Sequence, residues 1–99
     1  MRLSERQRQV IVSSVKETLG EEARVLLFGS RVDDKLKGGD IDLYVQLNAK
    51  IDRPALMIAT LQAKIIRQLG EQKIDVLLSA PNLIRQPIHE IAEQQGILL

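Results

Sequence analysis

Three aspartates stand at positions where β-strands would orient their side chains. Asp40 and Asp42 lie in residues 40–47, where polar and apolar residues alternate as they do in a strand with one buried face. Residues two apart on a strand point to the same side, so both carboxylates are expected to project together. Asp75 lies in a second alternating segment, residues 73–78. The apolar residues expected on the core side of the first segment are Ile41, Leu43 and Val45.

Clustered carboxylates have a recognisable chemistry. Two anions held side by side raise each other's pKa unless a cation relieves the repulsion, and oxygen ligands favour a hard ion such as Mg²⁺. If the two segments form neighbouring strands, three carboxylates meet on one patch and can serve two metal ions about 3.5–4 Å apart. Asp is disfavoured within strands, which favours a specific role for all three. The alternative, left open by the sequence, is that each is a solvated residue on an exposed strand face.

A short turn motif is the second candidate feature. Gly29, Ser30 and Arg31 follow the apolar segment 24–28, which is typical of a buried strand. At such a strand end, backbone N–H groups and the Ser30 hydroxyl could bind phosphate oxygens, and glycine would let the phosphate approach. Arg31 could pair with a phosphate. The alternative is an ordinary surface turn with a surface arginine.

The order of these motifs resembles the nucleotidyltransferase superfamily that includes DNA polymerase beta. Nine residues separate Ser30 from Asp40, and a hydrophobic-Asp-hydrophobic strand follows later. Within that superfamily the chain is most similar to the minimal nucleotidyltransferases, the MNT-type antitoxins that are paired with HEPN toxins. The segments that carry the resemblance are residues 27–31, 38–43, 73–77 and 91–96, together with Leu98.

The resemblance implies a site and a reaction. It implies that Asp40 and Asp42 hold Mg²⁺ and the triphosphate, that Asp75 completes the metal site and helps to activate the acceptor, and that the Gly-Ser pair binds phosphate. It also implies two Mg²⁺ ions, ATP as the substrate, and transfer of AMP to a tyrosine of a helical HEPN toxin. Many relatives continue the turn as Gly-Ser-Arg-Ala-Arg-Gly. This chain departs from that pattern at Val32, Asp33 and Asp34, which puts catalysis in doubt and leaves open an antitoxin that acts by occupancy alone.

The elements that must position these residues follow from hydrophobic periodicity and from helix-ending glycines. We expect helices at residues 4–19, 54–69 and 88–95, strands at residues 24–28, 40–47 and 73–78, an excursion at 30–39 and a turn region at 48–53. A capping box at Ser4 and Gln7 marks the first helix. The order predicts a single domain over residues 1–99 of the α/β (α+β) class, a small mixed sheet with helices packed on it and a nucleotidyltransferase-like fold.

The amino-acid composition limits the kinds of molecule that the protein is expected to bind. Fourteen basic residues against 13 acidic ones give a net charge of +1, and Phe28 and Tyr44 are the only aromatic residues, so nothing favours nucleic-acid binding. The chain has no cysteine, which excludes disulfides and thiolate metal sites. It has no apolar run long enough for a membrane span and no signal peptide at its start, so we expect a cytoplasmic protein.

A chain of 99 residues leaves no room for a domain that grips an acceptor, so the acceptor is expected to bind an open face. Another protein or another copy of this chain would complete that face. The 54–69 helix carries two apolar stripes, which suggest either a second contact or one broad core-facing side. His89, a lone histidine without ligand partners, is given no role. The first stripe is Ile58, Leu61, Ile65 and Leu69, and the second is Leu56, Ala59, Ala63 and Ile66.

Overall fold

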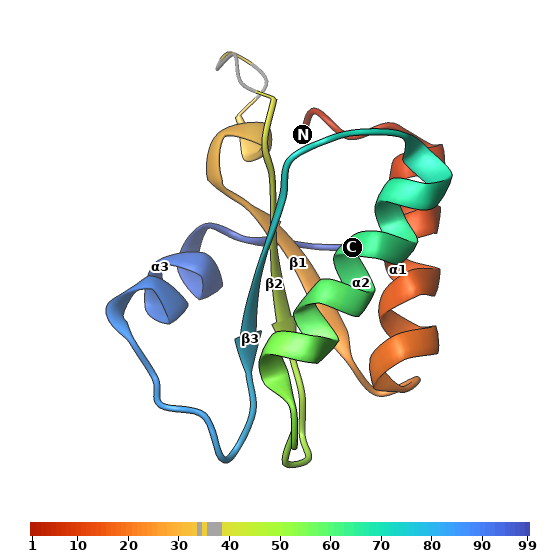
Figure 1. Ribbon diagram of the computed structural model, residues 1–99. Coiled ribbons are helices and arrows are strands. Elements are labelled where there is room, and N and C mark those ends of the chain that lie inside the picture. The colour runs from red at the N-terminus through yellow and green to blue at the C-terminus, as the bar shows by residue number, and fades with distance from the viewer. Residues whose placement is uncertain (34, 36–38) are drawn as a thin grey trace.

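The structure is a computed structural model that describes residues 1–33, 35 and 39–99 (Figure 1). Its elements follow the expected order with two additions, a 3₁₀ turn after the first strand and a two-residue strand at the end. They are α1 (Glu5–Leu19), β1 (Arg24–Phe28), η1 (Gly29–Val32), β2 (Ile41–Gln46), α2 (Pro54–Leu69), β3 (Ile74–Ser79), α3 (Pro87–Gln95) and β4 (Ile97–Leu98).

The four strands form one mixed sheet in the order β3-β2-β1-β4. β1 runs antiparallel to both β2 and β4, whereas β2 and β3 are parallel. A parallel pair needs a crossover connection, and α2 supplies it. The expected α+β class with a small mixed sheet is therefore confirmed.

Helices cover both faces of the sheet. Helices α1 and α2 pack together on one face and α3 lies on the other, as Figure 1 shows. The main core lies beneath α1 and α2. Its fully buried members are Ile11, Val15, Leu27, Ile41, Leu43, Val45, Leu61 and Ile65. A second, smaller cluster beneath α3 consists of Leu26, Tyr44 and Ala92.

The expected alternation of β2 is confirmed, with one addition. The three apolar residues Ile41, Leu43 and Val45 are fully buried in the main core. Tyr44 on the opposite side of the strand is fully buried as well, because α3 covers that part of the sheet. Only the ends of this face, including the position of Asp42, retain exposure to solvent.

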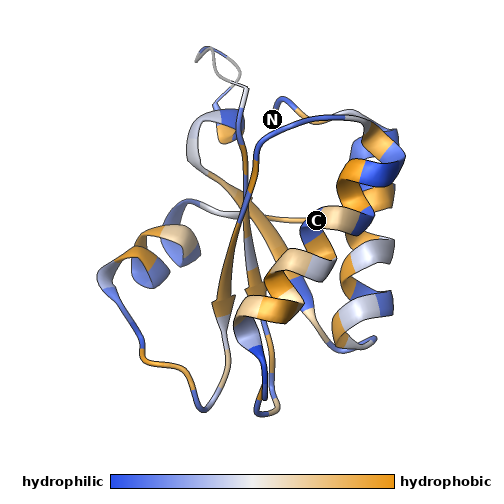
Figure 2. Cartoon of the chain, in the orientation of Figure 1, coloured by the Kyte–Doolittle hydropathy of each residue, from blue (hydrophilic) through white to orange (hydrophobic). Residues whose placement is uncertain are grey.

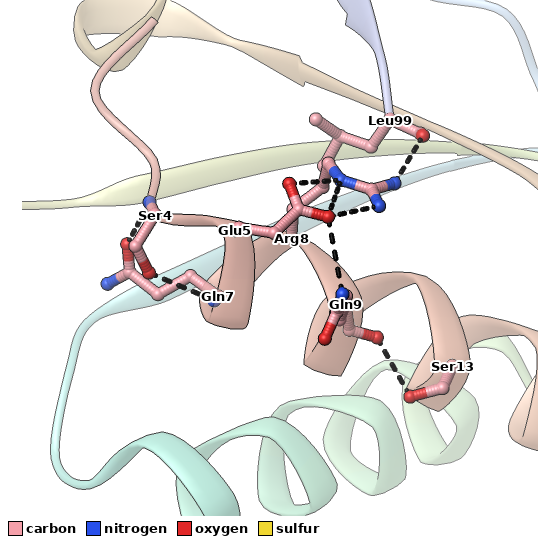
Figure 3. A network of polar contacts seen from close by, with 7 residues as sticks. All are labelled: Ser4, Glu5, Gln7, Arg8, Gln9, Ser13 and Leu99. Atoms are coloured by element: carbon pink, nitrogen blue, oxygen red, sulfur yellow. Dashed lines mark hydrogen bonds and ion pairs between the residues drawn. The ribbon is translucent and has the colours of Figure 1, made fainter.

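The first helix is closed at its start by the predicted capping box. The Ser4 hydroxyl accepts from the Gln7 N–H at 3.0 Å, and the Gln7 side chain accepts from the Ser4 N–H at 2.8 Å (Figure 3). Arg8, one residue further on, pairs with Glu5 and also donates to the carbonyl of Leu99 at 3.2 Å. Arg8 thereby joins α1 to the chain that follows β4.

The last strand was not predicted. Ile97 and Leu98 pair with Leu27 and Leu26 of β1, and the Leu99 N–H donates to the carbonyl of Val25 at 2.9 Å. A strand of two residues has too few positions to show an alternation in sequence, so only the sheet itself reveals it.

The two stripes of α2 differ in their surroundings. Leu61 and Ile65 of the first stripe are fully buried, with Ile58 and Leu69 packed at the margin of the core. In the second stripe Ile66 packs against the core, whereas Leu56 is 49% exposed and the two alanines are exposed.

In Figure 2 the strands are mostly apolar, and α1 and α2 mix apolar and polar residues. No helix in the described part of the chain has the length and apolar character to cross a bilayer.

Candidate functional site

Asp42 and Asp75 occupy the same register position on neighbouring strands. Asp42 of β2 pairs with Asp75 of the parallel strand β3 on one side and with Phe28 of antiparallel β1 on the other. Residues paired across a sheet point to the same face, and neighbouring strands lie roughly 4.7–4.9 Å apart. The structure therefore brings these two of the predicted carboxylates together, on the face that α3 covers further along.

The third carboxylate lies one step outside the strand. Asp40 precedes β2, which begins at Ile41, and its side chain forms an ion pair with Lys73, with Asp40 Oδ2 and Lys73 Nζ 3.6 Å apart. The Ile41 N–H donates to the Lys73 carbonyl at 3.0 Å, so the chain just before β2 runs alongside the chain just before β3. Asp40 thus lies at the same end of the strands as Asp42 and Asp75, but its side chain has the cation Lys73 as its neighbour.

The charges of the three aspartates act on one another. Burial raises the pKa of the Asp42 carboxyl above its usual value, and the negative charges of Asp75 and Asp40 and a hydrogen bond with Asp75 raise it further. The positive charge of Lys73 opposes that rise. The charged form of Asp42 is therefore disfavoured by burial and by the two neighbouring carboxylates.

The Gly-Ser turn lies directly against Asp42. Gly29 begins η1 with φ +78°, a left-handed value that favours glycine, and a Cβ atom at this position would collide with Oδ2 of Asp42. The close approach requires a residue without a side chain. Ser30 follows and is partly exposed. The predicted phosphate-binding residues and the predicted metal-binding residues are therefore adjacent in space.

Arg31 is bound to the backbone. Its guanidinium donates through Nε to the carbonyl of Asp40 at 3.2 Å, through Nη1 to that of Arg2 at 2.9 Å and through Nη2 to that of Gly39 at 3.0 Å. These bonds tie the turn to the N-terminal segment and to the chain that leads into β2. In this arrangement Arg31 positions the peptide of Asp40, and its assignment to a nucleotide stays a prediction.

The residues that depart from the resembling family are partly described. Val32 packs against the main core, and the Asp33 carboxylate accepts from the Lys35 N–H at 2.8 Å, so Asp33 stabilises its own turn. Asp34 lies outside the described residues, as does Gly38 of the expected excursion at 30–39.

The fit to a metal ion is good for two carboxylates and incomplete for the third. Asp42 and Asp75 offer oxygen atoms of the kind that Mg²⁺ prefers, and their mutual repulsion would be relieved by a cation. As the side chains lie, no three acidic or histidine residues of the described part of the chain gather closely enough to hold a metal ion. The Asp40 carboxylate is instead paired with Lys73.

A row of contacts beside Asp42 holds α3 on the sheet, and the sequence did not reveal it. The buried Tyr44 hydroxyl donates to Glu93 at 2.7 Å, and Arg85 pairs with the same carboxylate. The hydrogen bonds from Arg85, and to a lesser extent that from Tyr44, lower the pKa of Glu93 to about 2. Tyr44 was visible in sequence only as one of two aromatic residues, and its partner lies 49 positions away.

His89 also serves the packing of α3. It is buried with a 5% exposed fraction, which the sequence did not predict. Its Nδ1 accepts from the Gln86 N–H at 2.9 Å, so Nε2 carries the proton and donates to the Leu78 carbonyl at 2.8 Å. Both ring nitrogens are satisfied, and the ring meets Tyr44 edge-on with 5.8 Å between centroids. These contacts explain its burial without any catalytic role.

A cavity in the described part of the chain is remote from the three aspartates. It has a volume of about 800 Å³ and lies between the end of α1 and the segment after β2, where Thr18, Leu47, Lys50 and Met57 contribute to its wall. Asp42 stands near the start of β2 and this cavity at the other end of the strand. The three aspartates take no part in the wall of this cavity; Asp75 is exposed at the surface and Asp42 is half-buried.

In comparisons with known proteins, the sequence matches no protein-family model and no curated protein. Function therefore has to be argued from the arrangement of the site and from the motif resemblance.

Proposed function

We propose that this protein is a metal-dependent nucleotidyltransferase that transfers AMP from ATP to a hydroxyl group on a partner protein. The observation that carries the proposal is the in-register pairing of Asp42 with Asp75 beside the glycine of a Gly-Ser turn. The order of these motifs along the chain is what resembles the minimal nucleotidyltransferases, and the α+β fold with a small mixed sheet is compatible with that resemblance.

The residues divide the work as follows. The turn at Gly29 and Ser30 would bind the terminal phosphates of the triphosphate, and Asp40, Asp42 and Asp75 would provide oxygen ligands for two Mg²⁺ ions. When bound, Mg²⁺ supplies positive charge that stabilises the triphosphate and the departing pyrophosphate. Arg31 keeps the peptide of Asp40 in place next to the turn.

The transfer exchanges one phosphorus–oxygen bond for another. The acceptor oxygen forms a bond to the α-phosphorus while the bond from that phosphorus to the oxygen bridging to the β-phosphate breaks. Pyrophosphate leaves with the bonding electrons, and the hydroxyl proton passes to the carboxylate of Asp75, which acts as the general base. Asp75 suits this task because it is exposed and lies beside Asp42.

The acceptor is a protein that covers the aspartate face. The site is open, and the resemblance implies a helical HEPN toxin whose tyrosine receives the AMP. A second copy of this chain is the other way to complete the face. In the cell, the protein would then act as the cytoplasmic antitoxin of a toxin–antitoxin pair.

A second candidate is an antitoxin that neutralises its partner by occupancy. It is favoured by the pairing of Asp40 with Lys73 and by the absence, among the described residues, of three gathered metal ligands. Asp33 also favours this candidate, because the resembling family carries another residue at this position and the Asp33 carboxylate here accepts from the Lys35 N–H of its own turn.

One experiment separates the two candidates. The candidate partner is incubated with this protein, Mg²⁺ and ATP labelled at the α-phosphate, and the partner is then examined for label and by intact mass spectrometry. The transferase predicts an added AMP with the wild type and none with Asp42→Asn. Inhibition of the partner without any mass change, equal for both proteins, would support occupancy.

A further inference from the structure

Lys73 stands in an unusual place for a surface lysine. Its Nζ lies 3.6 Å from Oδ2 of Asp40, and its charge also acts on Asp42, two residues further along β2. Lys73 directly precedes β3, and Asp75 is the second residue of that strand. The ammonium group is therefore at the margin of the carboxylate cluster.

The pairing is easy to break. The Lys73 side chain is 69% exposed and that of Asp40 is 47% exposed, so water screens the attraction and solvates both groups when they separate. The backbone of Lys73 is fixed independently, because its carbonyl accepts from the Ile41 N–H at 3.0 Å. The side chain can leave Asp40 without disturbing the strand that carries Asp75.

The pairing also has a consequence for metal binding. Asp40 cannot offer the same oxygen to Lys73 and to a metal ion, and an ammonium group beside the site repels a divalent cation. We propose that Lys73 is a built-in counter-ion of the aspartate cluster that a divalent cation must displace from Asp40, so that Lys73 lowers the affinity of the site for metal. This inference rests on the proposed function, which places metal at the three aspartates.

A divalent cation that displaces Lys73 from Asp40 leaves the lysine side chain next to the aspartate cluster. Once separated from Asp40, its flexible side chain remains within reach of the cluster, where a triphosphate would bring negative charge. For a lysine whose pairing was merely structural, removal would weaken metal binding or leave it unchanged.

The test is direct binding of Mn²⁺, a spectroscopically visible substitute for Mg²⁺, without nucleotide or partner. Free Mn²⁺ is measured by electron paramagnetic resonance during titration of the wild type, Lys73→Gln, Lys73→Arg and Lys64→Gln. Lys64→Gln is the matched control. Lys64 lies on α2 and also forms a surface ion pair, but with Glu17 of α1, at 3.8 Å, and not with an aspartate of the cluster. Thermal unfolding in the presence of a chelator verifies that each variant is folded.

We expect Lys73→Gln to bind Mn²⁺ about fivefold more tightly than the wild type, a change in keeping with the modest strength of exposed ion pairs. Lys73→Arg and Lys64→Gln should bind as the wild type does. Binding by Lys73→Gln alone, with none detectable in the wild type, would also support the inference. Equal or weaker binding by Lys73→Gln than by a wild type that does bind would overturn it and leave the proposed metal site standing. If no variant binds Mn²⁺, the proposed metal site fails, and the role of Lys73 fails with it.

Discussion

Gly29 and Asp42 are in direct contact across the β1–β2 pair. Gly29 adopts φ +78°, and any side chain at this position would overlap the Asp42 carboxylate. The contact joins the two halves of the proposed site, since Gly29 belongs to the turn proposed to bind phosphate and Asp42 to the cluster proposed to bind metal. The turn and the aspartate cannot be altered independently.

Replacing Gly29 by alanine should therefore damage the site more than the fold. The left-handed backbone costs an alanine about 1–2 kcal/mol, and the added methyl group pushes the Asp42 carboxylate from its place. We expect lower thermal stability and loss of Mg²⁺-dependent ATP binding, measured by differential scanning fluorimetry and calorimetry. Gly70→Ala is the control, because Gly70 has φ +87° with nothing within 4 Å of a Cβ atom. A Gly29→Ala protein that binds ATP as well as Gly70→Ala does would contradict the close approach.

Removal of the Asp42 charge should stabilise the metal-free protein at neutral pH. The pKa of Asp42 is raised in the folded state, so folding favours its protonated form. Stability linked to this group is full below the ordinary pKa of 3.8 and is lost as the pH rises through the higher folded value. Asp42→Asn should thus unfold at a higher temperature than the wild type at pH 7 in the presence of a chelator. The difference between the two unfolding temperatures should shrink as the pH falls toward 3.8. If Asp42→Asn unfolds at the same temperature as the wild type at pH 7, or at a lower one, the charge of Asp42 does not destabilise the folded protein.

Arg31 should prove important for stability. Its guanidinium donates to three backbone carbonyls, and lysine keeps the charge but cannot match this planar geometry. We expect Arg31→Lys to lower the free energy of unfolding by about 1–2 kcal/mol in chemical denaturation. Arg24→Lys, at an exposed position of β1, should change it by less than about 0.5 kcal/mol. If Arg31→Lys retains full stability and loses affinity for ATP instead, Arg31 is a phosphate ligand.

Sequence reasoning succeeded where local signals decide the structure. The capping box at Ser4, the glycines after α1 and α2, and the alternation around Asp42 and Asp75 located the helices and strands to within about one residue. These signals depend on neighbouring residues and on the spacing at which apolar residues recur in a helix or strand, and both can be read from the sequence. The face to which Asp42 and Asp75 point follows from the same alternation.

The remaining features depend on residues that are distant in sequence. The in-register pairing of Asp42 with Asp75 is set by the crossover through α2, and no local pattern specifies register in a parallel pair. The burial of Tyr44 and His89 follows from the docking of α3, whose exposed isoleucines, Ile88 and Ile91, disguise which side faces the sheet. The pairing of Lys73 with Asp40 likewise appears only once β2 and β3 are side by side.

The binding of ATP tests the central claim most directly, because it requires the turn, the aspartates and the metal together but no partner protein. Isothermal titration calorimetry is performed with the wild type and with Asp42→Asn, each with Mg²⁺ and with a chelator. The account predicts saturable ATP binding by the wild type only when Mg²⁺ is present, and none by Asp42→Asn under either condition. Equal binding by both proteins, or no binding by the wild type in Mg²⁺, would contradict it.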